Sequence, residues 1–288
     1  MNPPRHSDAL IRSVADTALW MAAVRASEGL RADAVFQDRL GSILAEERGR
    51  SIARSFSRRA MLAWGVVART SAIDRLIAEE LRNGVDTVLN LGAGMDTRPY
   101  RMDLPPQTRW VEVDFPNIVE TKNTSLAAYT PVCPVERVGM DLLDRASRSE
   151  FFSRHASGSH HVLVITEGLV AYFCNDDVAL LAKELFAMPS IAGWIQDFDN
   201  AGSRPQPRGW AKKLEAAPFR FQVKNWFEFF KEYGWRPRKL ITNLEESERN
   251  HRPYPFDFPF GMILRALPKE MSRRILSLSG AVLLEKAT

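Results

Sequence analysis

Apolar residues recur at helical spacing through the first eighty residues of the chain. Within 13–30, for example, Leu19, Met21 and Val24 stand where a helix would bury them together, and Gly29 lies near the end of the segment. The same spacing continues over three further segments: 36–47, 52–67 and 72–81. We therefore expect a helical N-terminal cap over residues 1–84.

The pattern changes at Asp86, where short apolar runs begin to alternate with segments of helical composition. The runs occupy 86–92, 108–114, 132–140, 160–168 and 190–198. The helical segments between them occupy 116–129, 147–155 and 175–186. Such alternation is typical of a doubly wound α/β fold with a mostly parallel sheet. We expect one domain over 1–288, with the α/β body covering 85–288.

The last part of the chain continues the body with a helix over 226–233 and strands over 236–241 and 276–284, which brings the expected sheet to seven strands. Between these two strands lies RNHRPYPFDFPFGM, a stretch rich in proline and aromatic residues. This composition predicts a loop or lid at about 243–275.

Composition narrows the class of protein. No run approaches the roughly 18 uninterrupted apolar residues of a membrane span, and the first residues lack the apolar core of a signal peptide. Cys133 and Cys174 are far apart and have no nearby His or Cys partners, so we expect neither disulfides nor a metal site. These observations predict a cytoplasmic protein without membrane contact.

Charge raises the question of nucleic acid. Arg50, Arg54 and Arg58 recur four residues apart and would form one stripe on a helix, and the net charge is +4. The 35 acidic residues nearly match the 39 basic ones, however, and are interleaved with them. A solvated helix face is the favoured interpretation of the stripe, and a nucleic-acid surface is the alternative.

The strongest chemical signal is LNLGAGMDTR, residues 89–98, which directly follows the first predicted strand. Gly92 and Gly94 permit a tight turn and a close approach of a ligand to the backbone. Asp114 ends the second strand, where an acidic residue can hydrogen-bond a ribose diol. The combination predicts a ligand that contains adenosine.

The residues after the glycines distinguish between adenosine ligands. Asp96 would place negative charge beside a pyrophosphate, and Thr97 stands where dinucleotide sites have a third small residue. S-adenosylmethionine has no phosphate and carries a sulfonium and an ammonium, so it suits this turn better than NAD does. Its carboxylate needs a cation, for which Arg69 and Arg98 are candidates.

Four ordered blocks, LGAGMDTR, EVDFP, GMDLLD and TEGLVAYF, together with ARTSAID at 68–74, resemble the signature blocks of the leucine carboxyl methyltransferase family. That family includes bacterial polyketide O-methyltransferases of the tetracenomycin type. The resemblance covers about residues 14–200 well and the remainder loosely. It implies a class I, Rossmann-like methyltransferase with S-adenosyl-L-methionine as cofactor.

The resemblance also implies roles for individual positions around the cofactor: the methionine carboxylate for Arg69, the glycine loop for Gly92, the ribose for Asp114, the adenine for Asp141 and Leu142, and the methionine amino group for Glu167. The predicted strand pattern agrees, because these acids follow strands at the edge where open α/β sheets bind ligands. The alternatives are a helix N-cap for Asp141 and a solvated loop acid for Glu167.

The acceptor determines which further groups are needed. A carboxylate acceptor is already ionised and requires alignment and exclusion of water, whereas a phenol or alcohol requires a general base. His251, in the loop after the sixth strand, is the histidine placed for that role. The same loop carries aromatic residues that we expect over the acceptor pocket: Tyr254, Phe256, Phe258 and Phe260. An ordinary packed loop explains this stretch equally well.

Two further parts of the chain are expected at the pocket. Tyr172 follows Glu167 by five residues, and its ring would face the methyl donor or acceptor and favour the sulfonium. Plain packing explains Tyr172 equally well. The first helix, through Trp20, Met21 and Arg25, would form the opposite wall, with Arg25 meeting an acidic acceptor.

The sequence thus predicts an S-adenosylmethionine-dependent O-methyltransferase for a small-molecule acceptor, a carboxylate of a polyketide-like or other natural product. Methylation of a protein C-terminal carboxyl group stays open, because the family includes it. Nucleic-acid methylation is disfavoured, because TEGLVAYF stands where an Asn/Asp-Pro-Pro-aromatic box would. An oxidoreductase that uses NAD and a non-catalytic binding protein are the remaining alternatives. Oligomeric state and pathway cannot be predicted.

Overall fold

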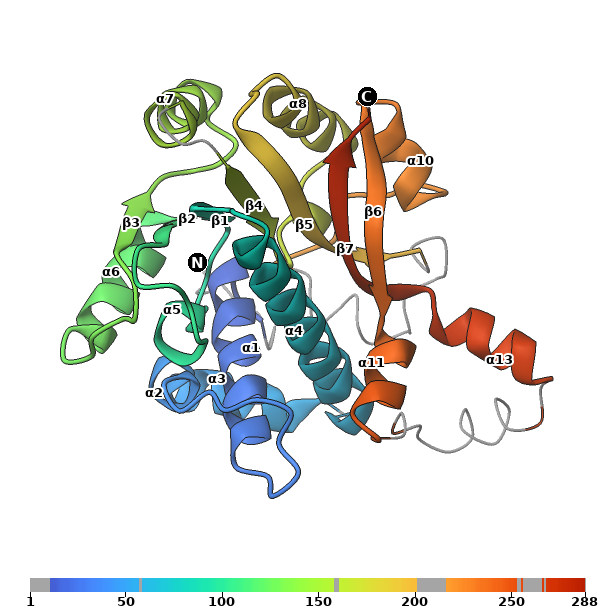
Figure 1. The fold of residues 1–288 in the computed structure, drawn as a ribbon. Helices are drawn as coiled ribbons and strands as arrows, with labels where there is room; N and C mark the ends of the chain where they lie inside the picture. Colours follow the sequence, from blue (N-terminus) through green and yellow to red (C-terminus); the bar gives the residue numbers. More distant parts are fainter. Residues whose placement is uncertain are drawn as a thin grey trace, which may run out of the picture.

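A seven-stranded sheet in the order β3-β2-β1-β4-β5-β7-β6 forms the centre of the molecule (Figure 1). The computed structural model describes residues 11–56, 59–157, 161–200, 216–252, 255, 266 and 268–287. The strands are β1 (Thr87–Leu91), β2 (Arg109–Asp114), β3 (Val135–Gly139), β4 (Val162–Thr166), β5 (Ile191–Asp199), β6 (Trp235–Thr242) and β7 (Ser279–Lys286). β7 runs antiparallel to both neighbours, and the other pairs are parallel. The expected fold class is confirmed.

Helices cover both faces of the sheet, and the first helices of the chain lie below it in the view of Figure 1. They are α1 (Val14–Gly29), α2 (Gly41–Leu44), α3 (Glu46–Ser55), α4 (Arg59–Arg82), α5 (Arg98–Arg101), α6 (Pro116–Leu126), α7 (Arg145–Ala156), α8 (Asn175–Phe186), α10 (Trp226–Lys231), α11 (Asn243–Arg249) and α13 (Lys269–Leu276). α7, α8 and α10 pack on one face and α4 on the other. β1 and β4 are therefore buried along their whole length, which explains their unbroken apolar runs.

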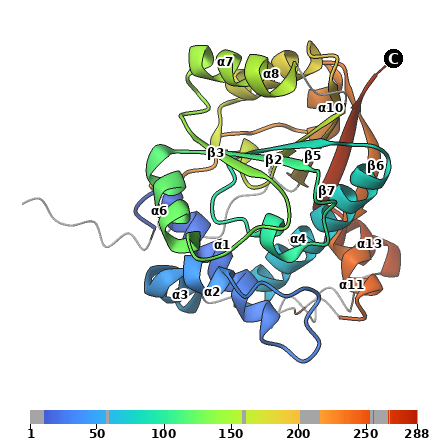
Figure 2. The same cartoon turned by 60° about the vertical axis from the view of Figure 1, so that its left-hand side comes forward.

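α4 connects the helical cap to the sheet, because it packs against both. The first half of α4 packs with α1 and α3 around Trp64 and Val67, and its second half packs on the sheet through Ile73 and Ile77. Figures 1 and 2 both place α1–α3 at the opposite end of the molecule from α7 and α8. Within the described ranges, no helix has the length and apolar character needed to cross a membrane.

The helices expected near residue 60 were wrong in their boundaries. A single helix over 52–67 is interrupted at Phe56, which is extended (φ −81°, ψ 129°), while α4 runs without the expected gap before residue 72. The buried Phe56 ring stacks on Trp20 at 4.3 Å between centroids, and this contact holds Phe56 outside the helix. The helix expected over 36–47 shrinks to α2 and the start of α3.

The interval 243–275, expected to be a loop or lid, contains α11 and α13. Thr242 and Glu245 form a capping box that begins α11, a signal readable in the sequence. Leu276 ends α13 rather than beginning the last strand, which starts at Ser279. The expected lid residues Tyr254, Phe256, Phe258 and Phe260 lie outside the described residues.

Candidate active site

A cavity of about 500 Å³ follows the edge of the sheet at which the parallel strands end. Its lining includes residues at or directly after the ends of β2, β1, β4, β5 and β6, and a residue near the start of β7, which runs antiparallel and therefore begins at this edge. These residues are Asp114, Gly92, Glu167, Asp197, Gly280 and Asn243. α1 forms the facing wall with Thr17, Ala18, Trp20, Met21 and Arg25. The predicted position of α1 at the pocket agrees with this arrangement.

The glycine loop after β1 is shaped for a ligand. Gly92 (φ 69°) and Gly94 (φ 48°) adopt left-handed backbone conformations, which glycine reaches without a Cβ clash. The Gly92 amide donates to the carbonyl of Val113 at 2.8 Å and hooks the loop onto β2. The loop therefore leaves its backbone open to the cavity beside the end of β2.

Asp114 closes that end of the cavity. Its two carboxylate oxygens accept the amides of Gly94 at 2.7 Å and Phe115 at 2.8 Å. Burial raises the pKa of Asp114 above its ordinary value, although these two hydrogen bonds oppose the shift. Each oxygen keeps a further lone pair for a hydroxyl donor. The carboxylate thus has the free acceptor positions that a ribose diol would need, and the predicted ribose contact stays a prediction.

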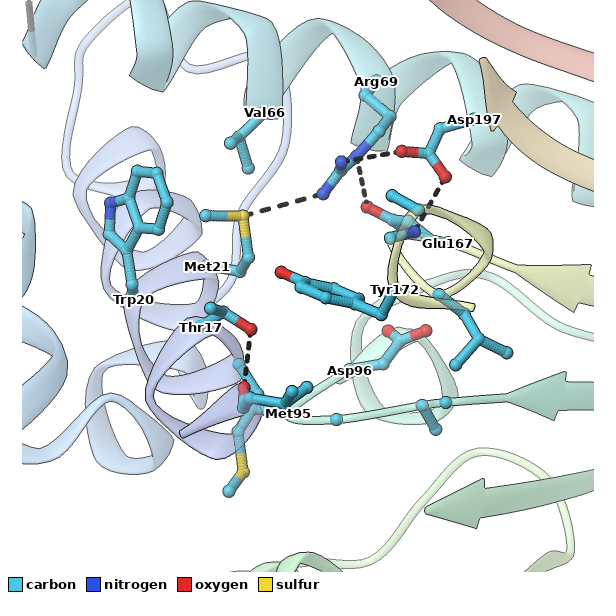
Figure 3. A pocket seen from close by; sticks show the side chains of 18 of the residues that line it. Thr17, Trp20, Met21, Val66, Arg69, Met95, Asp96, Glu167, Tyr172 and Asp197 are labelled. Atoms are coloured by element: carbon cyan, nitrogen blue, oxygen red, sulfur yellow. Dashed lines mark hydrogen bonds and ion pairs between the residues drawn. The ribbon is translucent and has the colours of Figure 1, made fainter. Parts of the chain in front are cut away.

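Arg69 reaches from α4 into the cavity between two acids (Figure 3). Its Nε donates to Glu167 at 3.0 Å, and its Nη1 donates to Asp197 at 3.0 Å. Its Nη2 meets the sulfur of Met21 at 3.6 Å, a weak acceptor. Arg69 therefore retains a donor group that fits the carboxylate of an amino-acid moiety, while Glu167 and Asp197 fit its ammonium.

Arg98, the other candidate for a carboxylate, is engaged by three acids. Only 2% of its side chain is exposed, and its nitrogens donate to Asp74 at 2.6 Å, Asp96 at 2.7 Å and Glu167 at 2.7 Å. Burial alone would raise the pKa of Glu167, but Arg98 and Arg69 outweigh it and hold that pKa below its ordinary value. Arg98 and Asp96 line the cavity, but they are ion-paired with each other. Neither therefore offers an unpaired charge to a ligand.

Asp141 and Leu142 do not reach the cavity as it is described. Asp141 is exposed in the turn after β3 and accepts the amide of Leu143 at 2.9 Å. Leu142 is buried in the core beneath α7. The N-cap of α7 is Asp144, which accepts the amide of Ala146 at 3.1 Å. The implied adenine contacts therefore stay predictions without support from this geometry.

His251 also lies apart from the cavity. It is exposed at the end of α11, in a left-handed conformation (φ 51°), and does not line the pocket. The expectation of a general base at this position is therefore not supported by its place in the fold. α11 carries the chain away from the sheet edge before His251 is reached.

Tyr172 does line the cavity, and its hydroxyl points toward α1 (Figure 3). Burial raises its pKa, although a hydrogen bond with Thr17 and the nearby Arg69 charge oppose the shift. Its ring lies 5.4 Å from that of Phe219. The hydroxyl therefore stays protonated near neutral pH, and the role of Tyr172 as an orienting or cation-facing ring stays a prediction.

Arg25 and the arginine stripe have other partners than expected. Arg25 lines the cavity but pairs with Asp38 at 2.9 Å, so its charge is not directed at an acceptor. Arg50 and Arg54 both pair with Glu47 on an exposed face. Arg58 lies outside the described residues. The two described members of the stripe thus agree with the solvated-face interpretation.

Sequence reasoning missed Asp197 and much of the apolar lining. Asp197 lies in the last part of β5, and the strand-end rule that singled out Asp114 would have found it in SIAGWIQDF. The aromatic residues around it come from three separate segments: Phe198, Phe219, Phe221 and Trp226. No local pattern connects these segments, because only the tertiary fold brings them to one cavity.

Comparison with known proteins identifies the family of the chain. The model of the leucine carboxyl methyltransferase family matches residues 18–186. A Streptomyces coelicolor protein, provisionally described as an S-adenosyl-L-methionine-dependent methyltransferase, is 36% identical over 185 residues, or 59% of this chain and 63% of that protein. A Mycobacteroides abscessus protein with the same description is 28% identical over 219 residues, or 70% of this chain and 67% of that protein. The match thus spans just under two thirds of the Streptomyces relative.

Two solved structures share the fold. A Thermobifida fusca protein, provisionally described as a methyltransferase, superimposes with a TM-score of 0.59 at 15% identity, covering 99% of each chain. A DUF574 family protein from Streptomyces avermitilis gives a TM-score of 0.57 at 19% identity, covering 92% of this chain and 96% of that one. Because the family model matches more than half of the sequence, the chain belongs to the leucine carboxyl methyltransferase family.

Proposed function

We propose that this protein transfers the methyl group of S-adenosyl-L-methionine to an oxygen of a small-molecule acceptor, a carboxylate of a polyketide-like or other natural product. The observation that carries the proposal is one cavity that joins the glycine loop and Asp114 to a wall of aromatic side chains. One end has the polar groups that fit the cofactor. The other end has the apolar surface that suits a small organic acceptor.

The chain's own residues divide the work of holding the cofactor. Asp114 accepts the ribose hydroxyls, and Arg69 meets the methionine carboxylate through its Nη2. Glu167 and Asp197 place two acids where the ammonium would lie. When bound, the cofactor supplies an electrophilic methyl group on a sulfonium. Tyr172 contributes a ring face that a cation favours.

The acceptor end favours an ionised oxygen nucleophile. None of the cavity-lining residues that the structure describes is a histidine, and a carboxylate needs no base near neutral pH. The arginines lining the cavity (Arg25, Arg69 and Arg98) each pair with acids already. A carboxylate between aromatic walls would therefore be shielded from water without being neutralised, which preserves its reactivity.

Calorimetric titration tests the cofactor part of the proposal. The wild-type protein should bind S-adenosylmethionine and S-adenosylhomocysteine but not NAD. Asp114→Ala should lose both sulfur ligands, because it removes the acceptor of the ribose hydroxyls. Asp103→Ala, at an exposed position, is the matched control and should bind normally. Wild-type binding of NAD alone would contradict the proposal.

A methyl-labelling assay tests the acceptor part. Labelled cofactor is incubated with aromatic carboxylic acids, the matching phenols, and a peptide ending in a leucine carboxylate. Alkali releases labelled methanol from methyl esters but leaves aryl methyl ethers intact, so the product identifies the acceptor group. Alkali-labile label on the small acids is expected. Label on the phenols alone would overturn the carboxylate assignment, and label on the peptide alone would point to protein methylation.

A further inference from the structure

The helical cap grips the glycine loop through a buried polar cluster beside the cavity. Arg25 on α1 donates from Nε to Asp38 at 2.9 Å and from Nη2 to the carbonyl oxygen of Met95. The other carboxylate oxygen of Asp38 accepts the Thr97 hydroxyl at 2.7 Å and the Gly41 amide at 2.8 Å. Arg25 is 8% exposed and Asp38 2% exposed. We call the group of Arg25, Asp38, Met95 and Thr97 the loop clasp.

We propose that Arg25 and Asp38 are positioning residues for the cofactor: they hold the backbone of residues 92–97 in the shape that receives it. The inference rests on the proposed function, in which this loop borders S-adenosylmethionine. Arg25 acts on the Met95 carbonyl and Asp38 on the Thr97 hydroxyl. The two bonds flank Asp96, so the loop is tied down at both sides of its turn.

Because Arg25 and Asp38 are buried, each needs the other as a partner. A buried ion pair contributes little net stability when complete, but it is costly to break because one charge is left without a partner. Burial alone would raise the pKa of Asp38, but Arg25 and Arg101 outweigh it and keep that pKa below its ordinary value. Asp38 is therefore ionised, and both of its oxygens stay engaged.

Packing limits the loop on the side of α1. A Cβ placed on Gly94 would lie 3.1 Å from the Cβ of Ala18, so helix and loop are already in close contact. Hydrogen bonds within the loop clasp hold the loop toward α1, and this contact stops it from moving further. Such two-sided restraint preorganises a binding loop and reduces the entropy lost when a ligand binds.

A second ion pair in the cap serves as a control for a purely structural role of Arg25 and Asp38. Asp16 and Arg48 form a partly buried ion pair, 2.6 Å between Oδ2 and Nη2, that joins α1 to α3. This pair also stabilises the cap, but its carboxylate and guanidinium bond each other rather than Met95 or Thr97. A variant at Asp16 therefore reports what a cap ion pair contributes without the loop.

The experiment compares Asp38→Asn, Asp16→Asn and wild-type protein by calorimetric titration with S-adenosylhomocysteine, with the melting temperature of each. We expect Asp38→Asn to weaken binding by about tenfold or more, equivalent to about 1.4 kcal/mol, and Asp16→Asn to leave the dissociation constant within about twofold. Equal affinities for both variants and wild type, whatever their melting temperatures, would overturn the proposal.

A milder variant keeps the test decisive if Asp38→Asn does not fold. Thr97→Val preserves the side-chain volume and removes one hydrogen bond to Asp38, so we expect binding to weaken severalfold. Thr108→Val, also buried but directly before β2, is its control. Unchanged affinity in Thr97→Val would then contradict the proposal. Failure of wild-type protein to bind either sulfur ligand would contradict the proposed function instead.

Discussion

At the scale of single residues, Arg98 shows how much buried charge the site contains. It holds carboxylates from α4, the glycine loop and the end of β4, with 2% of its side chain exposed. Arg98→Gln would leave these acids without their shared cation, and we expect a loss of about 3–5 kcal/mol in unfolding free energy, measured with urea. Arg54→Gln, which breaks an exposed pair with Glu47, should change the unfolding free energy little, because solvent screens that pair.

Asp114 gives a pH dependence at the same scale. Burial raises its pKa above the ordinary value of 3.8, so it takes up a proton while the pH is still above that value. The protonated form loses acceptor capacity for the ribose. Affinity for S-adenosylhomocysteine should therefore fall as the pH is lowered from about 7 towards about 4, measured by titration at constant salt.

Glu167, which lines the same cavity, is a useful contrast for that experiment. Arg98 and Arg69 hold the pKa of Glu167 below its ordinary value, so Glu167 stays ionised over the interval in which Asp114 titrates. Asp114→Asn should bind weakly and show little pH dependence over that interval. A pH profile in Asp114→Asn that still follows the wild-type slope would assign the titration to another group.

At the scale of elements, the close approach of α1 and α3 depends on Gly49. A Cβ at this position would lie 2.3 Å from the backbone carbonyl oxygen of Leu19. Gly→Ala in a helix normally stabilises by about 0.5–1 kcal/mol, but here we expect Gly49→Ala to destabilise by about 1–3 kcal/mol, because the helices must separate. Urea unfolding measures this, with exposed Ser51→Ala in α3 as control. A stabilised Gly49→Ala would contradict this close contact between the helices.

The elements also show what sequence could and could not predict. β1 and β4 were found because both faces are buried, so their residues form unbroken apolar runs. The break at Phe56 was not, because it depends on stacking with Trp20, thirty-six residues earlier in the chain. Helical periodicity continues through such a position, and only the tertiary contact ends the helix.

In the site, too, some residues could be predicted from local sequence and others depend on tertiary contacts. Asp114 was predictable from its place at the end of a strand, and Glu167, implied by the family resemblance, agrees with the same rule, because the topology brings these strand ends to one edge. The partners of Arg25 and Arg98 were not, since they come from an irregular segment and from three separate elements. Free cations were expected at both positions, whereas the fold neutralises each of them with acids. Local sequence specifies a side chain's charge, but only the fold determines its partner.

At the scale of the whole molecule, the cofactor should order cap and sheet together. The cavity is lined both by α1 and by strand ends, and the loop clasp connects the two. A ligand that binds only the folded state stabilises it by about 2.7 kcal/mol at a hundred times its dissociation constant. We expect S-adenosylhomocysteine to slow amide exchange in α1 as well as in residues 92–97, measured by hydrogen–deuterium exchange.

The regions in which amide exchange slows distinguish coupling between α1 and the glycine loop from a general stabilisation of the fold. α7 and α8 lie at the opposite end of the molecule from the cap (Figure 2), so the part of their exchange that occurs by local fraying should not change. Asp114→Ala with the same ligand should show no protection in either region. Protection confined to residues 92–97 would mean that the cofactor stabilises the glycine loop without stabilising α1. Protection of both, lost from α1 in Asp38→Asn, would make Asp38 the link between them.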